Sequence, residues 1–76
     1  MKEMLEYIAR GLVSDPEAVR VEEVGSGGEI TLRLSVGPGD MGKVIGKGGR
    51  VAKEIRSFMN AFAHKEGVRV SVDILD

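Results

Sequence analysis

The sequence contains no cysteine and no tryptophan, and only two of its 76 residues are proline. Without cysteine the chain can form neither a disulfide nor a thiolate-bound zinc site, so its fold has to rest on packing alone. No segment has the length of a transmembrane helix or the pattern of a signal peptide, which predicts a cytoplasmic protein without a membrane contact. At this length we expect one domain, residues 1–76, whose thin core would gain buried area from dimerisation.

Residues suited to catalysis are also scarce. The single histidine, His64, falls near the end of a predicted helix, where its positive form would complement the helix dipole. No pair of His, Cys or carboxylate residues has the spacing of a metal site or of an activated nucleophile. We therefore expect no enzymatic activity, no metal site and no small-molecule cofactor.

The hydrophobic pattern predicts three strands. Residues 29–36 and 68–75 alternate between apolar and polar side chains, so each strand should have one buried and one solvated face. A shorter strand is expected around residues 19–24. It would form a hairpin with the 29–36 strand through a glycine-rich loop at 25–28.

Three helical segments complete the pattern. Residues 1–13 predict an amphipathic helix, residues 40–45 a short helical turn capped by Asp40, and residues 50–66 a longer helix. The apolar stripe of the first helix consists of Met1, Met4, Leu5, Ile8 and Leu12, and that of the long helix of Val51, Ile55, Phe58 and Phe62, widened by Ala52 and Met59.

The predicted order is therefore α-β-β-α-α-β. Since every strand has one polar face, the helices should cover only the opposite face, giving an α/β fold of the α+β two-layer sandwich type. The strands at 29–36 and 68–75 should be parallel neighbours in a three-stranded mixed sheet, joined by a right-handed crossover.

The net charge is −1, but the charges are unevenly distributed. Residues 1–39 carry four basic and seven acidic groups, and residues 57–76 carry two basic and three acidic ones. Residues 40–56 carry five basic groups against two acidic ones, a local excess of three positive charges. This excess surrounds a glycine-rich segment, where we expect a positive patch.

Two nucleotide-binding motifs nearly fit the glycine-rich segment. Gly37-x-Gly39-x-x-Gly42 follows a strand, as a dinucleotide fingerprint would, but a chain of this size cannot build the required sheet. Residues 37–43 also fit Gly-x-x-x-x-Gly-Lys, yet Val44 stands where a magnesium-binding Ser or Thr is needed. We interpret both as chance matches.

A third interpretation fits the segment better. The stretch 44–55 resembles the signature of KH domains: the aliphatic pair Val44-Ile45, a Gly-x-x-Gly loop at 46–49, and a helix with apolar residues at the third and sixth positions after it, here Ala52 and Ile55. The order of elements resembles the type II KH fold over the whole chain. The segment 42–50 and the N-terminal residues Met1-Lys2-Glu3 are similar to the corresponding segments of the small, free-standing bacterial KH proteins of the KhpA family.

This resemblance implies a single-stranded RNA-binding protein that holds about four nucleotides at the loop. Such a protein would act as a post-transcriptional regulator or as an RNA chaperone-like factor. Few aromatics are present (Tyr7, Phe58 and Phe62), and none lies on a predicted strand, which argues against an RNA reader that stacks bases on its sheet. The alternative is a protein-interaction adaptor within a larger RNA-associated assembly. The resemblance implies a homodimer and a heterodimer with a larger KH-containing protein.

The candidate binding residues lie in and beside the loop. Backbone N–H groups at the start of the long helix lack partners, and the glycines let a sugar-phosphate chain approach them closely. Lys47 at the loop tip, with Arg50 and Lys53 on the helix, would contact phosphates, while Val44 and Ile45 would form an aliphatic floor under the bases. The predicted RNA-binding set is Lys43, Val44, Ile45, Gly46, Lys47, Gly48, Gly49, Arg50 and Lys53.

Overall fold

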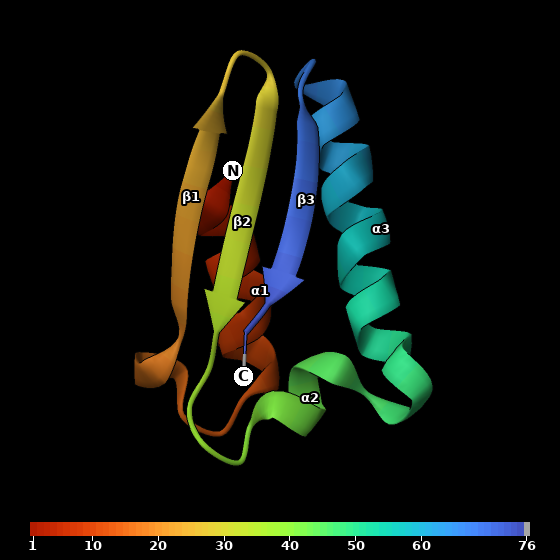
Figure 1. Cartoon of the computed structure of the whole chain (residues 1–76). Coiled ribbons are helices and arrows are strands. Elements are labelled where there is room, and N and C mark those ends of the chain that lie inside the picture. Colours follow the sequence, from red (N-terminus) through yellow and green to blue (C-terminus); the bar gives the residue numbers. More distant parts are fainter. Residues whose placement is uncertain (76) are drawn as a thin grey trace.

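The strands form one mixed sheet in the order β1-β2-β3 (Figure 1). The computed structural model describes residues 1–75, and within them two short 3-10 helices, η1 and η2, join the longer elements. The elements in chain order are α1 (Lys2–Leu12), η1 (Pro16–Ala18), β1 (Arg20–Ser26), β2 (Glu29–Ser35), α2 (Met41–Ile45), η2 (Lys47–Gly49), α3 (Arg50–Lys65) and β3 (Arg69–Ile74).

The central strand β2 has one antiparallel and one parallel neighbour. It pairs antiparallel with β1, where Val21 lies opposite Leu34, and parallel with β3, where Leu32 lies opposite Val72. The predicted parallel neighbours are therefore confirmed. The predicted loop at 25–28 was too long, because β1 continues to Ser26 and the chain reverses at residues 27 and 28.

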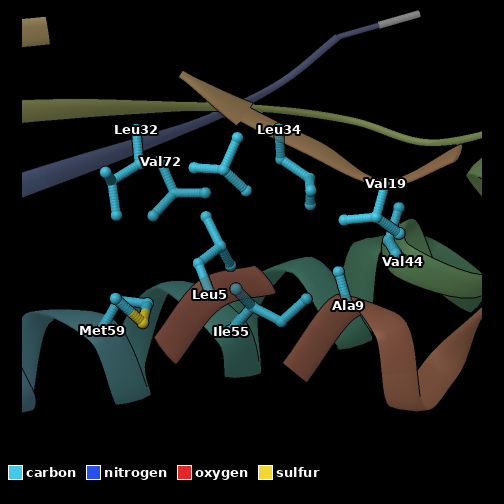
Figure 2. Packing of buried hydrophobic residues seen from close by; sticks show 10 residues of the cluster. Leu5, Ala9, Val19, Leu32, Leu34, Val44, Ile55, Met59 and Val72 are labelled. Carbon is cyan, nitrogen blue, oxygen red and sulfur yellow. The ribbon is translucent and has the colours of Figure 1, made fainter. Parts of the chain in front are cut away.

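The two longer helices cover one face of the sheet and leave the other open (Figure 1). Figure 2 shows the core between these layers, with side chains from α1 and α3 on one side and from the strands on the other. The two-layer sandwich predicted from the alternating strands is confirmed. The buried cluster consists of Leu5, Ala9, Val19, Val21, Leu32, Leu34, Val44, Ile55, Met59 and Val72.

The apolar face predicted for α3 was wrong in one important position. Phe58, placed on the core stripe by its spacing, is 48% exposed, whereas Met59 beside it is fully buried. The buried side of α3 also carries two alanines, Ala52 and Ala63. Small side chains let the helix lie close to the sheet, so the buried stripe is rotated away from the phenylalanine. Leu12 of α1 was likewise predicted in the core and is substantially exposed.

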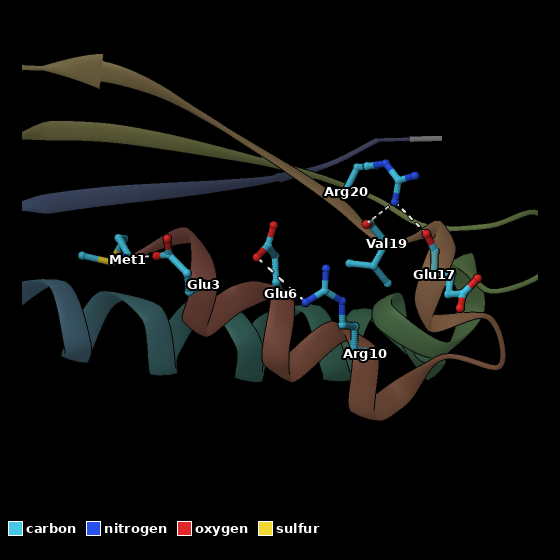
Figure 3. A network of polar contacts seen from close by, with 7 residues as sticks. All are labelled: Met1, Glu3, Glu6, Arg10, Glu17, Val19 and Arg20. Atoms are coloured by element: carbon cyan, nitrogen blue, oxygen red, sulfur yellow. Dashed lines mark hydrogen bonds and ion pairs between the residues drawn. The ribbon is translucent and has the colours of Figure 1, made fainter.

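Figure 3 shows polar contacts of α1 and η1 that join residues close together in the chain. The Arg20 guanidinium donates to the carbonyl of Glu17 at 2.6 Å and to that of Val19 at 2.9 Å, which fastens η1 to the first residue of β1. Arg10 and Glu6 form an ion pair at 4.0 Å, one turn apart on α1. An exposed pair of this kind adds little to stability. Within the described part of the chain, none of the helices combines the length and the apolarity that a membrane span requires.

Candidate nucleic-acid interface

The loop between α2 and α3 is a hydrogen-bonded turn at the edge of the molecule. The N–H of Gly46 donates to the carbonyl of Gly42 at 2.9 Å, which ends α2, and the N–H of Gly49 donates to the carbonyl of Gly46 at 3.0 Å. Between them η2 makes one turn, and α3 begins directly at Arg50. The backbone of the loop is therefore fixed by its own hydrogen bonds.

Glycine is required at the first loop position for two reasons. The backbone of Gly46 has φ 77° and ψ 168°, a conformation that is essentially restricted to glycine. A Cβ atom there would also lie 2.5 Å from the Cγ2 atom of Val51 and 2.8 Å from its backbone nitrogen. The close approach of the loop to α3 is thus possible only because residue 46 has no side chain.

Three predicted cations converge beside this loop. The side chains of Lys47, Arg50 and Lys53 are exposed, and together with Gly48 and Glu54 they line one open depression of about 580 Å³. Arg50 and Lys53 lie in the first turn of α3, which contains no acidic residue, although the positive end of the helix dipole disfavours cations there. This arrangement costs helix stability and presents positive charge to solvent, as an anion-binding surface requires.

Glu54 is a charged residue of this depression that was absent from the predicted set. Its carboxylate offsets one of the three positive charges. In the sequence, only its position directly after Lys53 indicated that Glu54 could lie near the loop cations. Sequence spacing alone did not show that α3 turns it toward the loop.

Lys43 does not share the surroundings of the other predicted cations. Its ammonium donates to Asp40 Oδ1 at 3.2 Å and to Ser14 Oγ at 3.0 Å, on the side of α2 that faces the end of α1. Arg56, the remaining cation of this segment, donates from Nε to the carbonyl of Val72 at 3.1 Å on the edge strand β3. Neither residue lines the depression at the loop.

The predicted role of Asp40 as a side-chain cap was wrong. Asp40 stands at the N-terminal boundary of α2, but its carboxylate makes no capping bond to that helix. Its two oxygens accept instead from the backbone N–H groups of Ser14 and Asp15, each at 3.1 Å. These bonds, led by that from Ser14, outweigh the effect of burial and lower the pKa of the Asp40 carboxyl from its usual value near 3.8.

The predicted aliphatic floor is divided between core and surface. Val44 is fully buried and packs in the main hydrophobic cluster, so its side chain supports the loop from beneath and offers no surface to a base. Ile45, the next residue, is half-buried. Of the predicted aliphatic pair, only Ile45 is accessible to a ligand.

The hairpin lies at the opposite end of the sheet from the α2–α3 loop (Figure 1), and residues at the hairpin end line a depression of about 700 Å³. Its charged or ionisable lining residues are Glu29, His64 and Arg69, so it has no net positive character. Within residues 1–75 no group of three His, Asp or Glu side chains is placed to hold a metal ion. The loop depression is smaller, but three cations, Lys47, Arg50 and Lys53, line it together with Gly48.

Comparisons with known proteins cover the whole length of the chain. A family model described as the KH domain of KhpA/KhpB matches residues 2–74. A protein of Clostridium acetobutylicum named RNA-binding protein KhpA is 53% identical over 75 residues, covering 99% of this chain and 100% of the relative.

Relatives with the same name occur in other bacteria. The protein from Halalkalibacterium halodurans is 51% identical over 76 residues, covering 100% of both chains. That from Chlamydia trachomatis is 43% identical over 76 residues, covering 100% of this chain and 97% of the relative. No solved structure is significantly similar to the chain.

Proposed function

Because this chain belongs to the KhpA/KhpB family of KH-domain proteins, we propose that it binds single-stranded RNA through the 46–49 loop. The observation that carries the proposal is the convergence of three cations, Lys47, Arg50 and Lys53, around one exposed depression that Gly48 also lines. The relatives are named RNA-binding proteins, and these names support the proposal. Binding here involves no chemical step, and we propose no cofactor.

The phosphate contacts follow from the chemistry of the loop. Lys47 carries a mobile point charge at the tip, and Arg50 can offer two parallel N–H groups to one phosphate. A Cβ-free backbone at the loop lets the sugar-phosphate chain approach the positive end of α3. With three phosphate contacts on a single strand, the logarithm of affinity should fall with the logarithm of salt with a slope of about −2.

Single strands are favoured over duplexes because of geometry. A KH loop clamps about four backbone nucleotides, and their bases must be unstacked to reach the protein. Ile45 offers a partly exposed aliphatic contact next to the loop. A single loop site of this kind suits a post-transcriptional regulator or an RNA chaperone-like factor.

The direct test compares two RNAs of equal length, one a flexible single strand and one a duplex. Fluorescence anisotropy should show tighter binding of the single strand, with the salt slope given above. Equal or tighter binding of the duplex would contradict the proposal, since a duplex offers more phosphates but no splayed bases.

A second candidate role, protein association, is favoured by an apolar groove between α1 and α3. Ile8, Leu12, Val51, Ile55 and Phe58 line it together with Glu54, and Phe58 is its most exposed apolar side chain. A small domain gains buried area by covering such a surface. We propose that this groove mediates a homodimer and, alternatively, pairing with a larger KH-containing protein. The two roles are compatible, because the loop cations line a different depression, which shares only Glu54 with the groove.

A further inference from the structure

The only buried charged side chain among residues 1–75 lies outside the proposed RNA surface. Asp40 is 3% exposed and stands where the β2–α2 connection meets the first turn of α2. Its carboxylate is satisfied by groups from two places: the backbone at Ser14 and Asp15, just after α1, and the ammonium of Lys43 on α2. A buried carboxylate needs such partners, so they are constrained by it in turn.

The backbone bonds anchor α2. This helix has only five residues, too few to be stable without tertiary contacts. Its C-terminal end is the RNA loop, and its N-terminal end is tied by Asp40 to a segment 25 and 26 residues earlier in the chain. The Asp40 carboxylate thereby fixes the direction in which α2 delivers residues 46–49.

The hydrogen bonds of the Lys43 ammonium limit its availability to a phosphate. Lys43 Nζ lies 3.2 Å from Asp40 Oδ1 and 3.0 Å from Ser14 Oγ. Its charge is matched by a carboxylate that has no other charged partner within residues 1–75. A phosphate would have to compete with this buried acceptor, whereas Lys47, Arg50 and Lys53 form no ion pair in the described structure.

We propose that Asp40 is a positioning residue for RNA binding, which anchors the loop-bearing helix α2 and holds the Lys43 ammonium away from the RNA. Phosphate contacts then come from Lys47, Arg50 and Lys53, and Lys43 has a structural role. This inference rests on the proposed RNA-binding function, and it changes the membership of the binding set that the sequence predicted.

The test uses matched lysine variants. Lys43→Met and Lys53→Met remove the same charge from exposed side chains, and binding to a short oligouridylate is measured between about 50 and 200 mM salt. Lys53→Met should make the slope shallower by about 0.7, as expected for one lost contact on a single strand, while Lys43→Met should leave it unchanged. If Lys43→Met also reduces the slope by about 0.7, Lys43 contacts phosphate and the inference is wrong.

A second pair of variants tests the role of Asp40. Asp40→Asn should release Lys43 and make the slope steeper by about 0.7, and adding Lys43→Met should return it to the original value. A structural role limited to folding would lower affinity without steepening the slope. If Asp40→Asn fails to fold, the comparison of Lys43→Met with Lys53→Met still decides.

A measurement without RNA separates this inference from the proposed function. In the side-chain ¹⁵N spectrum, the Nζ resonance of Lys43 should shift on Asp40→Asn, while that of Lys53 should not. An unshifted Lys43 resonance would overturn the pairing even if RNA binds as proposed. A shifted resonance in a protein that binds no oligouridylate would leave the pairing intact and refute the RNA-binding function.

Discussion

Gly46 and Val51 lie so close together that a Cβ atom on the glycine would stand 2.5 Å from the valine Cγ2 atom. This contact joins the first residue of the 46–49 loop to the first turn of α3. It explains why the loop lies directly against the helix that carries Arg50 and Lys53. The loop glycines are therefore unequal, since Gly48 has open space around its Cβ position.

We predict that Gly46→Ala destabilises the protein far more than Gly48→Ala. The first substitution combines a glycine-only backbone conformation with a steric clash and should cost about 3 kcal/mol or more. The second places alanine at φ 65° and ψ 18° in open space, with a cost of about 1 kcal/mol. Thermal unfolding should show this as a drop of more than about 12 °C against about 4–8 °C. Equal drops would mean that the 46–51 contact is not formed.

A second prediction tests the corrected face of α3. Met59→Ala should cost about 2–5 kcal/mol because it opens a cavity in the core, whereas Phe58→Ala should cost about 1 kcal/mol or less. Urea unfolding of the two variants measures the difference. If Phe58→Ala cost more than Met59→Ala, Phe58 would lie in the core, as its spacing predicted.

The error at Phe58 shows where sequence reasoning reaches its limit. The apolar positions of α3 define two overlapping stripes that share Ile55, and spacing favoured the stripe with the larger side chains. The predicted face correctly included Ala52 and Met59, but it omitted the buried Ala63 and included Phe58, which is exposed. Close approach of helix and sheet selects small residues on the buried side. By contrast, strand alternation has a period of two, which leaves no choice of buried face. The parallel pairing of β2 with β3 followed from the helical connection between them, because a crossover between neighbouring strands makes them parallel.

The loop was recognisable from local sequence, but its surroundings were not. Residues 46–49 and the nearby cations are close together in the chain, so their proximity needed no tertiary information. The bonds from Ser14 and Asp15 to Asp40 join residues 25 and 26 positions apart, and nothing in the sequence pairs them. The surroundings of Lys43 and Glu54 could not be predicted for this reason, since each depends on which neighbours the fold supplies.

A third prediction concerns pH. The pKa of Asp40 is lowered in the folded protein, chiefly by the backbone N–H of Ser14, so its ionised form stabilises the fold. This contribution is present above the unfolded pKa, near 3.8, and is lost as pH falls through the lower folded pKa. The urea concentration at the unfolding midpoint should therefore decrease when the pH is lowered below about 4. Asp40→Asn should make this midpoint less dependent on pH. An unchanged acid dependence in the variant would contradict the role given to this carboxylate.

A fourth prediction concerns the acidic residue beside the loop. Glu54→Gln removes a negative charge from the depression lined by Lys47, Arg50 and Lys53, so RNA affinity should rise a few-fold at low salt. The gain should shrink as salt is added, because the repulsion is screened. Glu66→Gln, a matched change just beyond the far end of α3, should have little effect. Equal effects of both variants would indicate a general response to net charge.

A fifth prediction tests the apolar groove. Phe58→Asp should abolish self-association, measured by sedimentation at micromolar concentrations, because it places a charge in the surface that a partner would cover. Tyr7→Asp is the control, since Tyr7 is an exposed aromatic of α1 outside the groove. RNA binding per protomer should survive both changes. A species of 8.2 kDa at high concentration in the unmodified protein would exclude the dimer.

The central claim is that the 46–49 loop binds RNA phosphates, and the most direct test changes charge at its tip while keeping shape. We compare Lys47→Asp/Gly48→Asp with Lys47→Asn/Gly48→Asn. Both variants place a similar side chain at the left-handed Gly48 position, which Asp and Asn tolerate, so folding by circular dichroism should be alike. Single-stranded RNA affinity of the aspartate variant should be at least about tenfold below that of the asparagine variant, equivalent to about 1.4 kcal/mol. Equal affinities of the two folded variants would show that the loop is only a turn.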